Sequence, residues 1–182
     1  TQSPERSRRL HHHLDILREL ANVPWRAWVT SENNFPTASG IASSASGFAA
    51  LTVAGCAGLG LDLDNTRLSA IARRSSGSAS RSLFGGFVEW VQGSGYADSV
   101  AVPRHGPEHW DLWVVVAVVS GEEKKLSSAD GHLLAASSPL LDGRIGHVDG
   151  WLEEVRAAID QRDIHRLGPV VELDALALPD GM

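Results

Sequence analysis

The chain has 182 residues, enough for one sizeable core, or for one domain and part of another. Hydrophobic residues make up 43% of it and the formal net charge is −6, which indicates an ordinary globular protein and argues against broad binding to nucleic acids or membrane surfaces. No apolar run approaches the length of a membrane span, no signal peptide is visible, and the single cysteine, Cys56, excludes an internal disulfide. We therefore expect a cytoplasmic protein.

The first residues predict a helix followed by a strand. Within residues 1–22, leucines recur at helical spacing, at Leu10, Leu14, Leu17 and Leu20. Pro24 ends the helical region, and the alternation over residues 26–30 predicts a strand. His11, His12 and His13 follow one another, but neighbours on a helix point roughly 100° apart and do not share an ion comfortably, so we expect no metal site there.

The next stretch, residues 33–47, reads NNFPTASGIASSASG and leads into a predicted helix over 43–58. Small residues let a ligand approach the backbone, and the first turn of a helix offers unpaired N–H groups and the positive end of its dipole. Together with the hydroxyls of Thr37, Ser39, Ser43, Ser44 and Ser46, these features predict a phosphate-binding loop. Neither a P-loop lysine nor a Gly-x-Ser-x-Gly elbow is present, and a small-residue helix packed in a core is the alternative.

A second serine-rich loop lies further along the chain. Asp64 or Asn65 is expected to cap a helix through Arg74, and residues 75–81 form the loop, with positive charge at Arg73, Arg74 and Arg81. Residues 83–91 then predict a strand. Gly85 and Gly86 within it indicate either a close backbone approach or a bulge.

The remaining residues predict two more strands and two more helices. The strands are expected at 100–102 and 113–119, the second a β-branched run typical of a sheet centre. Trp151, Leu152, Val155 and Ile159 mark an amphipathic helix. Asp163 is expected to cap the last helix, which Gly168-Pro169 would bend or interrupt. This order predicts a mixed α+β fold.

Two stretches together carry a family resemblance: PTASGIASSASGFAAL from Pro36 and SSGSASRSLFGGFVEW from Ser75. The pair resembles the signatures of the mevalonate diphosphate decarboxylase family in the GHMP kinase superfamily, and the resemblance extends over nearly the whole chain. It implies a two-lobed α+β GHMP-kinase-type fold, with mixed sheets packed against helices and without N- and C-terminal segments. Residues 1–126 would belong to the N-terminal ATP- and substrate-binding lobe, and 127–182 to the C-terminal lobe.

The resemblance also implies a function. Enzymes of this family phosphorylate the 3-hydroxyl of mevalonate 5-diphosphate with ATP and Mg²⁺, and loss of phosphate and CO2 then gives isopentenyl diphosphate in isoprenoid biosynthesis. The implied partner is a phosphorylated mevalonate, with no nucleic acid and no membrane, and the family is expected to form a homodimer.

The resemblance assigns roles to particular residues. ATP would be bound by Pro36, Thr37, Ala38, Ser39, Gly40, Ala42, Ser43, Ser44 and Ser46. The Ser44 hydroxyl would lie nearest the transferred phosphoryl group and Mg²⁺, and Ser44 and Arg81 would be catalytic. Substrate would be bound by Ser76, Ser78, Arg81 and Ser128, with Arg81 gripping the carboxylate through its planar fork.

The chain departs from the family pattern in several places. Ser75 stands where glycine is common, Ser80 where cysteine is common, and Ala129 where some bacterial relatives carry a phosphate-gripping arginine, which leaves mono- versus diphosphate specificity open. The family's lysine-bearing N-terminal strand would precede Thr1 and its catalytic aspartate would follow Leu178, so we expect a piece of a longer enzyme.

Three alternatives stay open. Two lie within the enzyme class: a decarboxylase of mevalonate 5-phosphate giving isopentenyl phosphate, or a GHMP small-molecule kinase. The Ser76-to-Arg81 spacing favours a decarboxylase, because the arginine needs a carboxylate to hold. The third is a noncatalytic anion-binding domain.

Overall fold

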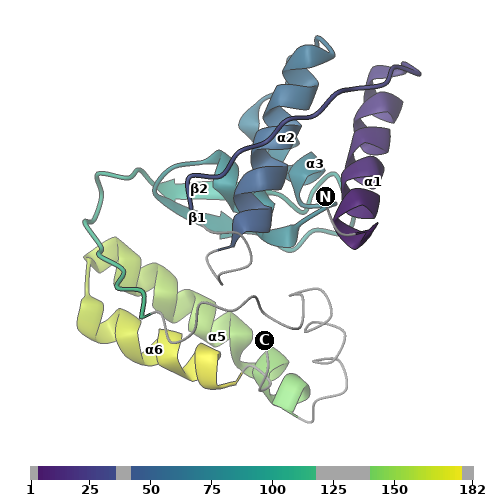
Figure 1. Ribbon diagram of the computed structural model, residues 1–182. Helices are drawn as coiled ribbons and strands as arrows, with labels where there is room; N and C mark the ends of the chain where they lie inside the picture. The colour runs from purple at the N-terminus through teal and green to yellow at the C-terminus, as the bar shows by residue number, and fades with distance from the viewer. Residues whose placement is uncertain (1–3, 36–41, 118–139, 178–182) are drawn as a thin grey trace. The chain divides into compact units, whose positions relative to one another are not determined.

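The structure, a computed structural model, describes residues 4–35, 42–117 and 140–177 (Figure 1). The chain divides into two compact units, Thr1–Asp111 and Leu112–Met182. The boundary at residue 126 that the resemblance implies lies outside the described residues. No described helix is long and apolar enough to cross a membrane.

Three helices build the core of the first unit: α1 (Pro4–Ala21), α2 (Ser43–Gly58) and α3 (Asn65–Ala72). Ile16 and Leu17 of α1 pack with residues of α2 and α3, in a cluster completed by Cys56, Leu68 and Ile71. Cys56 is 2% exposed, and burial raises the pKa of its thiol. Gly55 lets α1 approach α2, because a Cβ there would lie 2.4 Å from Cδ1 of Leu17.

The predicted boundaries hold for both ends of α2 and for the start of α3. α2 spans the residues predicted for it, and the chain turns after it through Gly60, which has a φ of 70°. The Asp64 side chain accepts a hydrogen bond from the Arg67 N–H and so caps α3. This helix ends at Ala72 rather than at Arg74.

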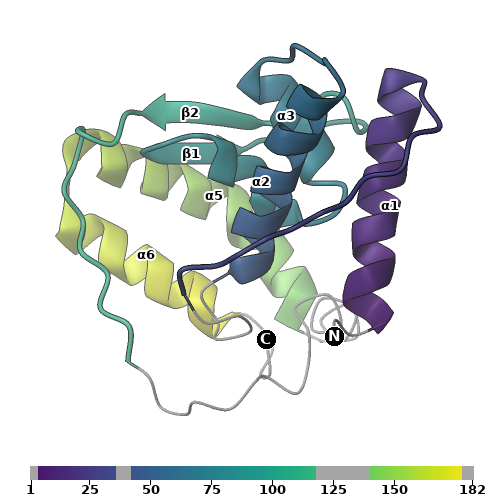
Figure 2. The same ribbon diagram turned by 45° about the horizontal axis from the view of Figure 1, so that its top comes forward.

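The segment after α3 differs in part from the loop predicted at 75–81 and the strand predicted at 83–91. Residues Gly77–Leu83 form a 3₁₀ helix, η1, and the strand β1 is confined to Phe87–Trp90. β1 pairs antiparallel with β2 (Ala101–His105), and Figure 2 shows the two strands side by side. Gly86 has a φ of 76°, and a Cβ there would lie 2.3 Å from the His105 carbonyl oxygen, so the expected close backbone approach is present. A register shift between Phe87 and Val88 follows it.

Two predicted strands are absent from the described part of the chain. Residues 23–33 and 112–117 form neither helix nor strand, so the strand predictions at 26–30 and over the described part of 113–119 are wrong. Alternation is a local signal, whereas a strand also needs a hydrogen-bonding neighbour, and the only ladder among the described residues joins β1 to β2. The apolar side chains of these segments stay open to solvent, with Trp28 96% exposed and Val115 93% exposed.

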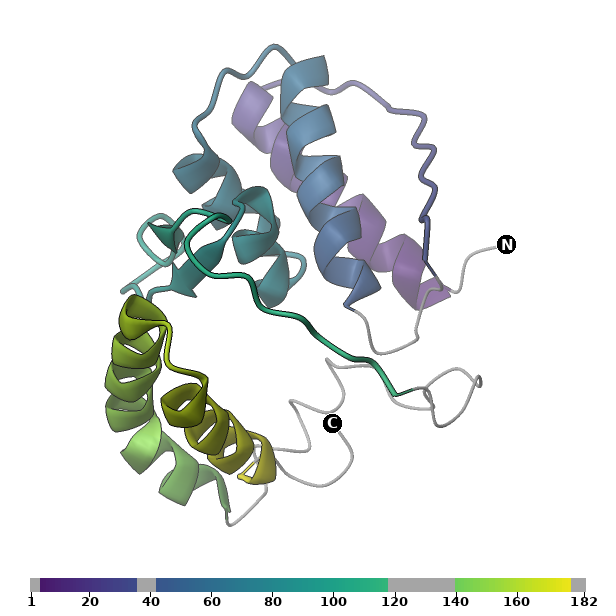
Figure 3. The same ribbon diagram turned by 90° about the vertical axis from the view of Figure 1, so that its left-hand side faces the viewer.

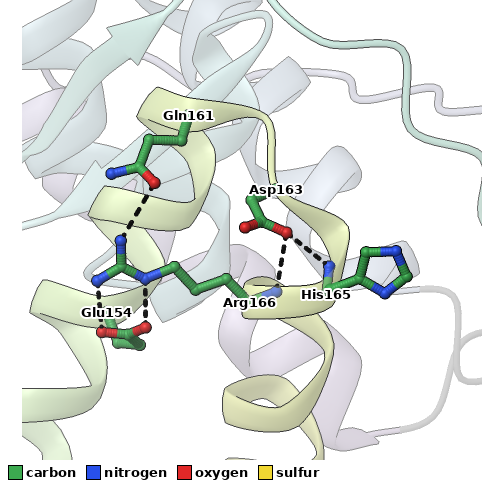
Figure 4. A network of polar contacts seen from close by, with 5 residues as sticks. All are labelled: Glu154, Gln161, Asp163, His165 and Arg166. Atoms are coloured by element: carbon green, nitrogen blue, oxygen red, sulfur yellow. Dashed lines mark hydrogen bonds and ion pairs between the residues drawn. The ribbon is translucent and has the colours of Figure 1, made fainter.

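The second unit contains a helical hairpin of α5 (Leu140–Gln161) and α6 (Ile164–Leu176), which lie side by side in Figure 3. Ala158 and Val170 are buried between them. The Asp163 carboxylate accepts hydrogen bonds from the N–H groups of His165 and Arg166, which confirms the predicted cap (Figure 4).

An ion pair joins the two helices of the hairpin, and α6 contains a proline. The Arg166 guanidinium forms a two-point ion pair with Glu154 of α5, which lowers the pKa of that carboxyl (Figure 4). α6 continues through Pro169, so of the bend or interruption predicted there, the interruption does not occur. The preceding residue, Gly168, has no Cβ to clash with the proline ring, which removes part of the usual penalty.

Candidate functional site

The N-terminus of α2 presents an anion-binding geometry. Ala42 precedes the helix in the left-handed conformation, with φ 52° and ψ 39°, and its own side chain makes no capping hydrogen bond. Ala45 N–H bonds back to the Ala42 carbonyl at 2.9 Å, and Ser44 and Ser46 are exposed on the first turn. The first turn of a helix carries N–H donors and the positive end of the helix dipole, which suit a negatively charged group.

The two serine-rich motifs meet at this helix end. Ser44 Oγ of α2 lies 3.4 Å from Ser76 Oγ, although the residues are 32 positions apart. Ser76 Oγ in turn lies 3.5 Å from Ser78 Oγ. Both distances are at the outer limit of hydrogen bonding, so the hydroxyls pair only weakly with one another and remain able to bind a ligand. The structure thus brings together one predicted ATP-binding residue and two predicted substrate-binding residues.

The local backbone explains where these hydroxyls lie. Ser76 is extended, with φ −154° and ψ 114°, and precedes η1; its carbonyl accepts the Ala79 N–H at 2.9 Å. A 3₁₀ helix has three residues per turn, so Ser78 and Arg81 lie on one face of η1. Arg81 is exposed, and within the described residues its guanidinium forms no ion pair. It is therefore available to an anionic ligand.

Several predicted site residues fall outside the described residues: Pro36, Thr37, Ala38, Ser39, Gly40 and Ser128. The roles assigned to them, and to the residues seen at the site, remain predictions. Among the described residues no group of three or more His, Cys, Asp or Glu side chains could hold a metal ion. The neighbouring histidines His105 and His109 stack on each other, with ring centroids 3.7 Å apart.

Of the arginines around the second loop, Arg73 has a structural role. Its guanidinium donates to the carbonyl oxygens of Ser99 at 2.8 Å and Gly95 at 3.0 Å, and it lies over the rings of Trp90 and Tyr96. These contacts hold the loop between β1 and β2 against the end of α3.

A buried histidine behind the site was missed as a functional residue. His13 is 0% exposed; its Nδ1 lies 2.8 Å from Ser75 Oγ and its Nε2 lies 3.1 Å from Thr52 Oγ1. Burial, aided by the positive charges of His12 and Arg74, lowers the pKa of His13 to about 4. The leucine spacing contained the signal, because His13 is three residues after Leu10 and four before Leu17 and so shares their face.

Comparisons with known proteins agree on one family. The sequence model described as "Diphosphomevalonate decarboxylase-like N-terminal domain" matches residues 1–101. The diphosphomevalonate decarboxylase of Ganoderma lucidum is 45% identical to this chain over 152 residues, which cover 81% of the chain and 38% of that enzyme. The chain therefore spans about two fifths of the length of such relatives.

Solved structures show the same fold. The mevalonate diphosphate decarboxylase of Staphylococcus aureus matches with a TM-score of 0.86 and 35% identity, covering 98% of this chain and 54% of that one. A structure described as MDDEF in complex with MVAPP, AMPPCP and magnesium also matches with a TM-score of 0.86 and 35% identity, covering 97% of this chain and 55% of that one.

These likenesses define an α+β domain of the mevalonate diphosphate decarboxylase type, mostly helical with a small sheet over the residues described. The chain belongs to the diphosphomevalonate decarboxylase-like family of the GHMP superfamily.

Proposed function

We propose that the full-length protein catalyses the ATP-dependent decarboxylation of mevalonate 5-diphosphate to isopentenyl diphosphate, and that this chain supplies part of both anion sites. The 3-hydroxyl oxygen bonds to the γ-phosphorus of ATP and loses its proton to water, and ADP leaves. The bond to the carboxylate then breaks, its electron pair forms the carbon–carbon double bond, and phosphate departs with the electrons of its C–O bond, releasing CO2. The two-lobed arrangement, with residues 1–126 and 127–182 in different lobes, is part of this proposal.

The observation that carries the proposal is the 3.4 Å separation of the Ser44 and Ser76 hydroxyl oxygens. Phosphoryl transfer depends on positioning the nucleotide and the acceptor within reach of each other. One motif predicted to bind the nucleotide and another predicted to bind the acceptor meet at this point, which supports a single site for both.

The residues at the helix end suit ATP and Mg²⁺. The first turn of α2 offers N–H groups to phosphate oxygens, and the exposed Ser44 offers a hydroxyl oxygen. Mg²⁺ takes oxygen ligands, commonly from substrate phosphates, water and few protein groups, so a single serine hydroxyl fits such an ion. When bound, the metal would neutralise charge on the phosphates. The related structure described with AMPPCP and magnesium supports this assignment.

Arg81 is assigned to the substrate carboxylate. Its exposed guanidinium shares a face of η1 with Ser78, and a planar guanidinium can hold a carboxylate by two parallel hydrogen bonds. Ser76 and Ser78 offer hydroxyls to the same substrate. MVAPP in two related structures supports a phosphorylated mevalonate as the ligand.

A coupled assay on the full-length protein tests the proposal. ATP and Mg²⁺ are supplied with either mevalonate 5-diphosphate or mevalonate 5-phosphate, and ADP and CO2 are followed together. Equal release of both products with the diphosphate supports the proposal, and equal release with the monophosphate alone indicates the other decarboxylase. ADP without CO2 indicates a kinase, and neither product indicates an anion-binding domain without catalysis.

A further inference from the structure

Two side chains of helix α1 contact Ser75, the residue that directly precedes Ser76 of the site. Arg9 Nη2 donates a hydrogen bond to the Ser75 carbonyl at 2.6 Å, and His13 Nδ1 lies 2.8 Å from Ser75 Oγ. Arg9 and His13 are four residues apart and so project from one face of α1. The N–H groups of Ser75 and Ser76 both bond to the Ala72 carbonyl at 3.2 Å. Ser75 is therefore fixed through its backbone and its side chain.

The direction of the hydrogen bonds through His13 follows from Thr52. The single hydroxyl hydrogen of Thr52 is donated to the Phe48 carbonyl at 2.6 Å, so Thr52 Oγ1 must accept from His13 Nε2. A neutral imidazole carries one N–H, so Nδ1 is the acceptor and the Ser75 hydroxyl is the donor. Burial keeps the ring neutral and hence keeps this order fixed.

We propose that His13 is a positioning residue for the anion site: by accepting the Ser75 hydroxyl, it holds the peptide that sets Ser76 facing Ser44 and Ser78. This inference rests on the proposed function for its ligand. His13 itself does not touch the substrate; it acts through Ser75.

The backbone around Ser75 shows why the hydrogen bond to His13 matters. Ser75 does not have a positive φ, so the conformation does not require the freedom of glycine. Ser76, 9% exposed, directly follows it and links the end of α3 to η1. Rotation of the peptide between them would move the Ser76 hydroxyl away from Ser44, and the hydrogen bond from Ser75 to His13 resists that rotation.

Two substitutions at one position separate positioning from packing. In His13→Asn the side-chain oxygen takes the place of ring Nδ1 and still accepts from Ser75. In His13→Gln the longer amide reaches toward Thr52 and leaves Ser75 without its acceptor. Ser75→Ala removes the donor to His13 Nδ1. Thr52→Val is the control, because it removes the partner of Nε2 and leaves Ser75 in place.

The binding experiment measures the Kd of mevalonate 5-diphosphate for the full-length protein by titration calorimetry. We expect His13→Gln and Ser75→Ala to raise the Kd about tenfold, because small misplacements of a binding group cost affinity, and His13→Asn to stay within about twofold of wild type. The double variant His13→Gln/Ser75→Ala should bind no more weakly than either single variant. Equal weakening by His13→Asn and His13→Gln, or an unchanged Kd in Ser75→Ala, would overturn the proposal.

A second readout needs no ligand. The Ala79 N–H bonds to the Ser76 carbonyl, so its hydrogen exchange reports on the peptide that His13 is proposed to hold. Exchange at Ala79 should be faster in His13→Gln and Ser75→Ala and unchanged in His13→Asn. If wild type fails to bind mevalonate 5-diphosphate but exchange follows this pattern, the proposed function fails while the positioning role stands. Equal exchange in all variants overturns the positioning role whatever the ligand.

Discussion

The Arg81 guanidinium is exposed, so a lysine at this position should not disturb the fold. We predict that Arg81→Lys keeps nucleotide affinity but lowers kcat/KM for decarboxylation about ten- to one-hundredfold, since one charged hydrogen bond contributes about 1.5–3 kcal/mol and lysine lacks the two-point fork. Steady-state kinetics of CO2 release measure the change. Arg67→Lys, an exposed arginine on α3, is the matched control, and wild-type turnover in Arg81→Lys would remove this residue from the site.

The buried His13 should also make the stability of the fold depend on pH. Its pKa is about 4 in the folded protein against 6.5 for an ordinary histidine, because burial and the nearby His12 and Arg74 disfavour the charged ring. Between pH 6.5 and 4, the unfolded chain therefore binds a proton at His13 that the folded chain does not bind. The folded state keeps its full stability above pH 6.5. As the pH falls toward 4, the free energy of unfolding falls by about 3 kcal/mol, at about 1.4 kcal/mol per pKa unit.

Urea unfolding between pH 7 and pH 4 measures this loss. The free energy of unfolding should fall less steeply in His13→Asn, and the exposed His11→Asn should behave like wild type. The same pH dependence in wild type and His13→Asn would show that His13 is not the group responsible.

At the scale of the helices, the contact between α1 and α2 depends on Gly55. A Cβ at residue 55 would overlap the buried Leu17 side chain, whereas one at Gly47 of the same helix meets nothing within 4 Å. Overpacking costs about 1–3 kcal/mol and alanine gains about 1 kcal/mol over glycine in a helix. We predict a net loss of about 1 kcal/mol in Gly55→Ala and a gain of up to about 1 kcal/mol in Gly47→Ala. Chemical denaturation of both variants compares them, and stabilisation by Gly55→Ala would mean that Leu17 moves aside freely.

The elements that the sequence predicts well are those whose signals are local. Asp64 and Asp163 mark two helix starts through their own side chains, and α2 ends at Gly58, two residues before Gly60. The predictions fail where a distant partner decides the outcome. Residues 26–30 alternate like a strand but pair with no other described segment. Residues 77–83, most of them predicted as a loop, form a 3₁₀ helix packed on α2 and α3.

The same distinction between local signals and distant partners applies to the candidate site. Its serines and Arg81 could be chosen from the sequence because the two motifs resemble a known family. The contact between Ser44 and Ser76 could not, since it depends on how α2, α3 and η1 pack. His13 was overlooked because its role depends on Ser75, which is 62 residues away in the sequence.

At the scale of the whole molecule, a chain that covers 38% of a related enzyme contains residues predicted for both the nucleotide and the acceptor. We propose that these residues form one site. A double-mutant cycle on the full-length protein tests it most directly, with kcat/KM for decarboxylation measured in Ser44→Ala, Ser76→Ala and the double variant. We predict that each single change costs about tenfold and that the double variant is about as active as the weaker single one, because groups that share a ligand are not additive. If the two losses multiply, the two motifs act independently and do not form one site. Ser82→Ala, at an exposed serine, is the matched control and should add nothing to the loss in Ser44→Ala.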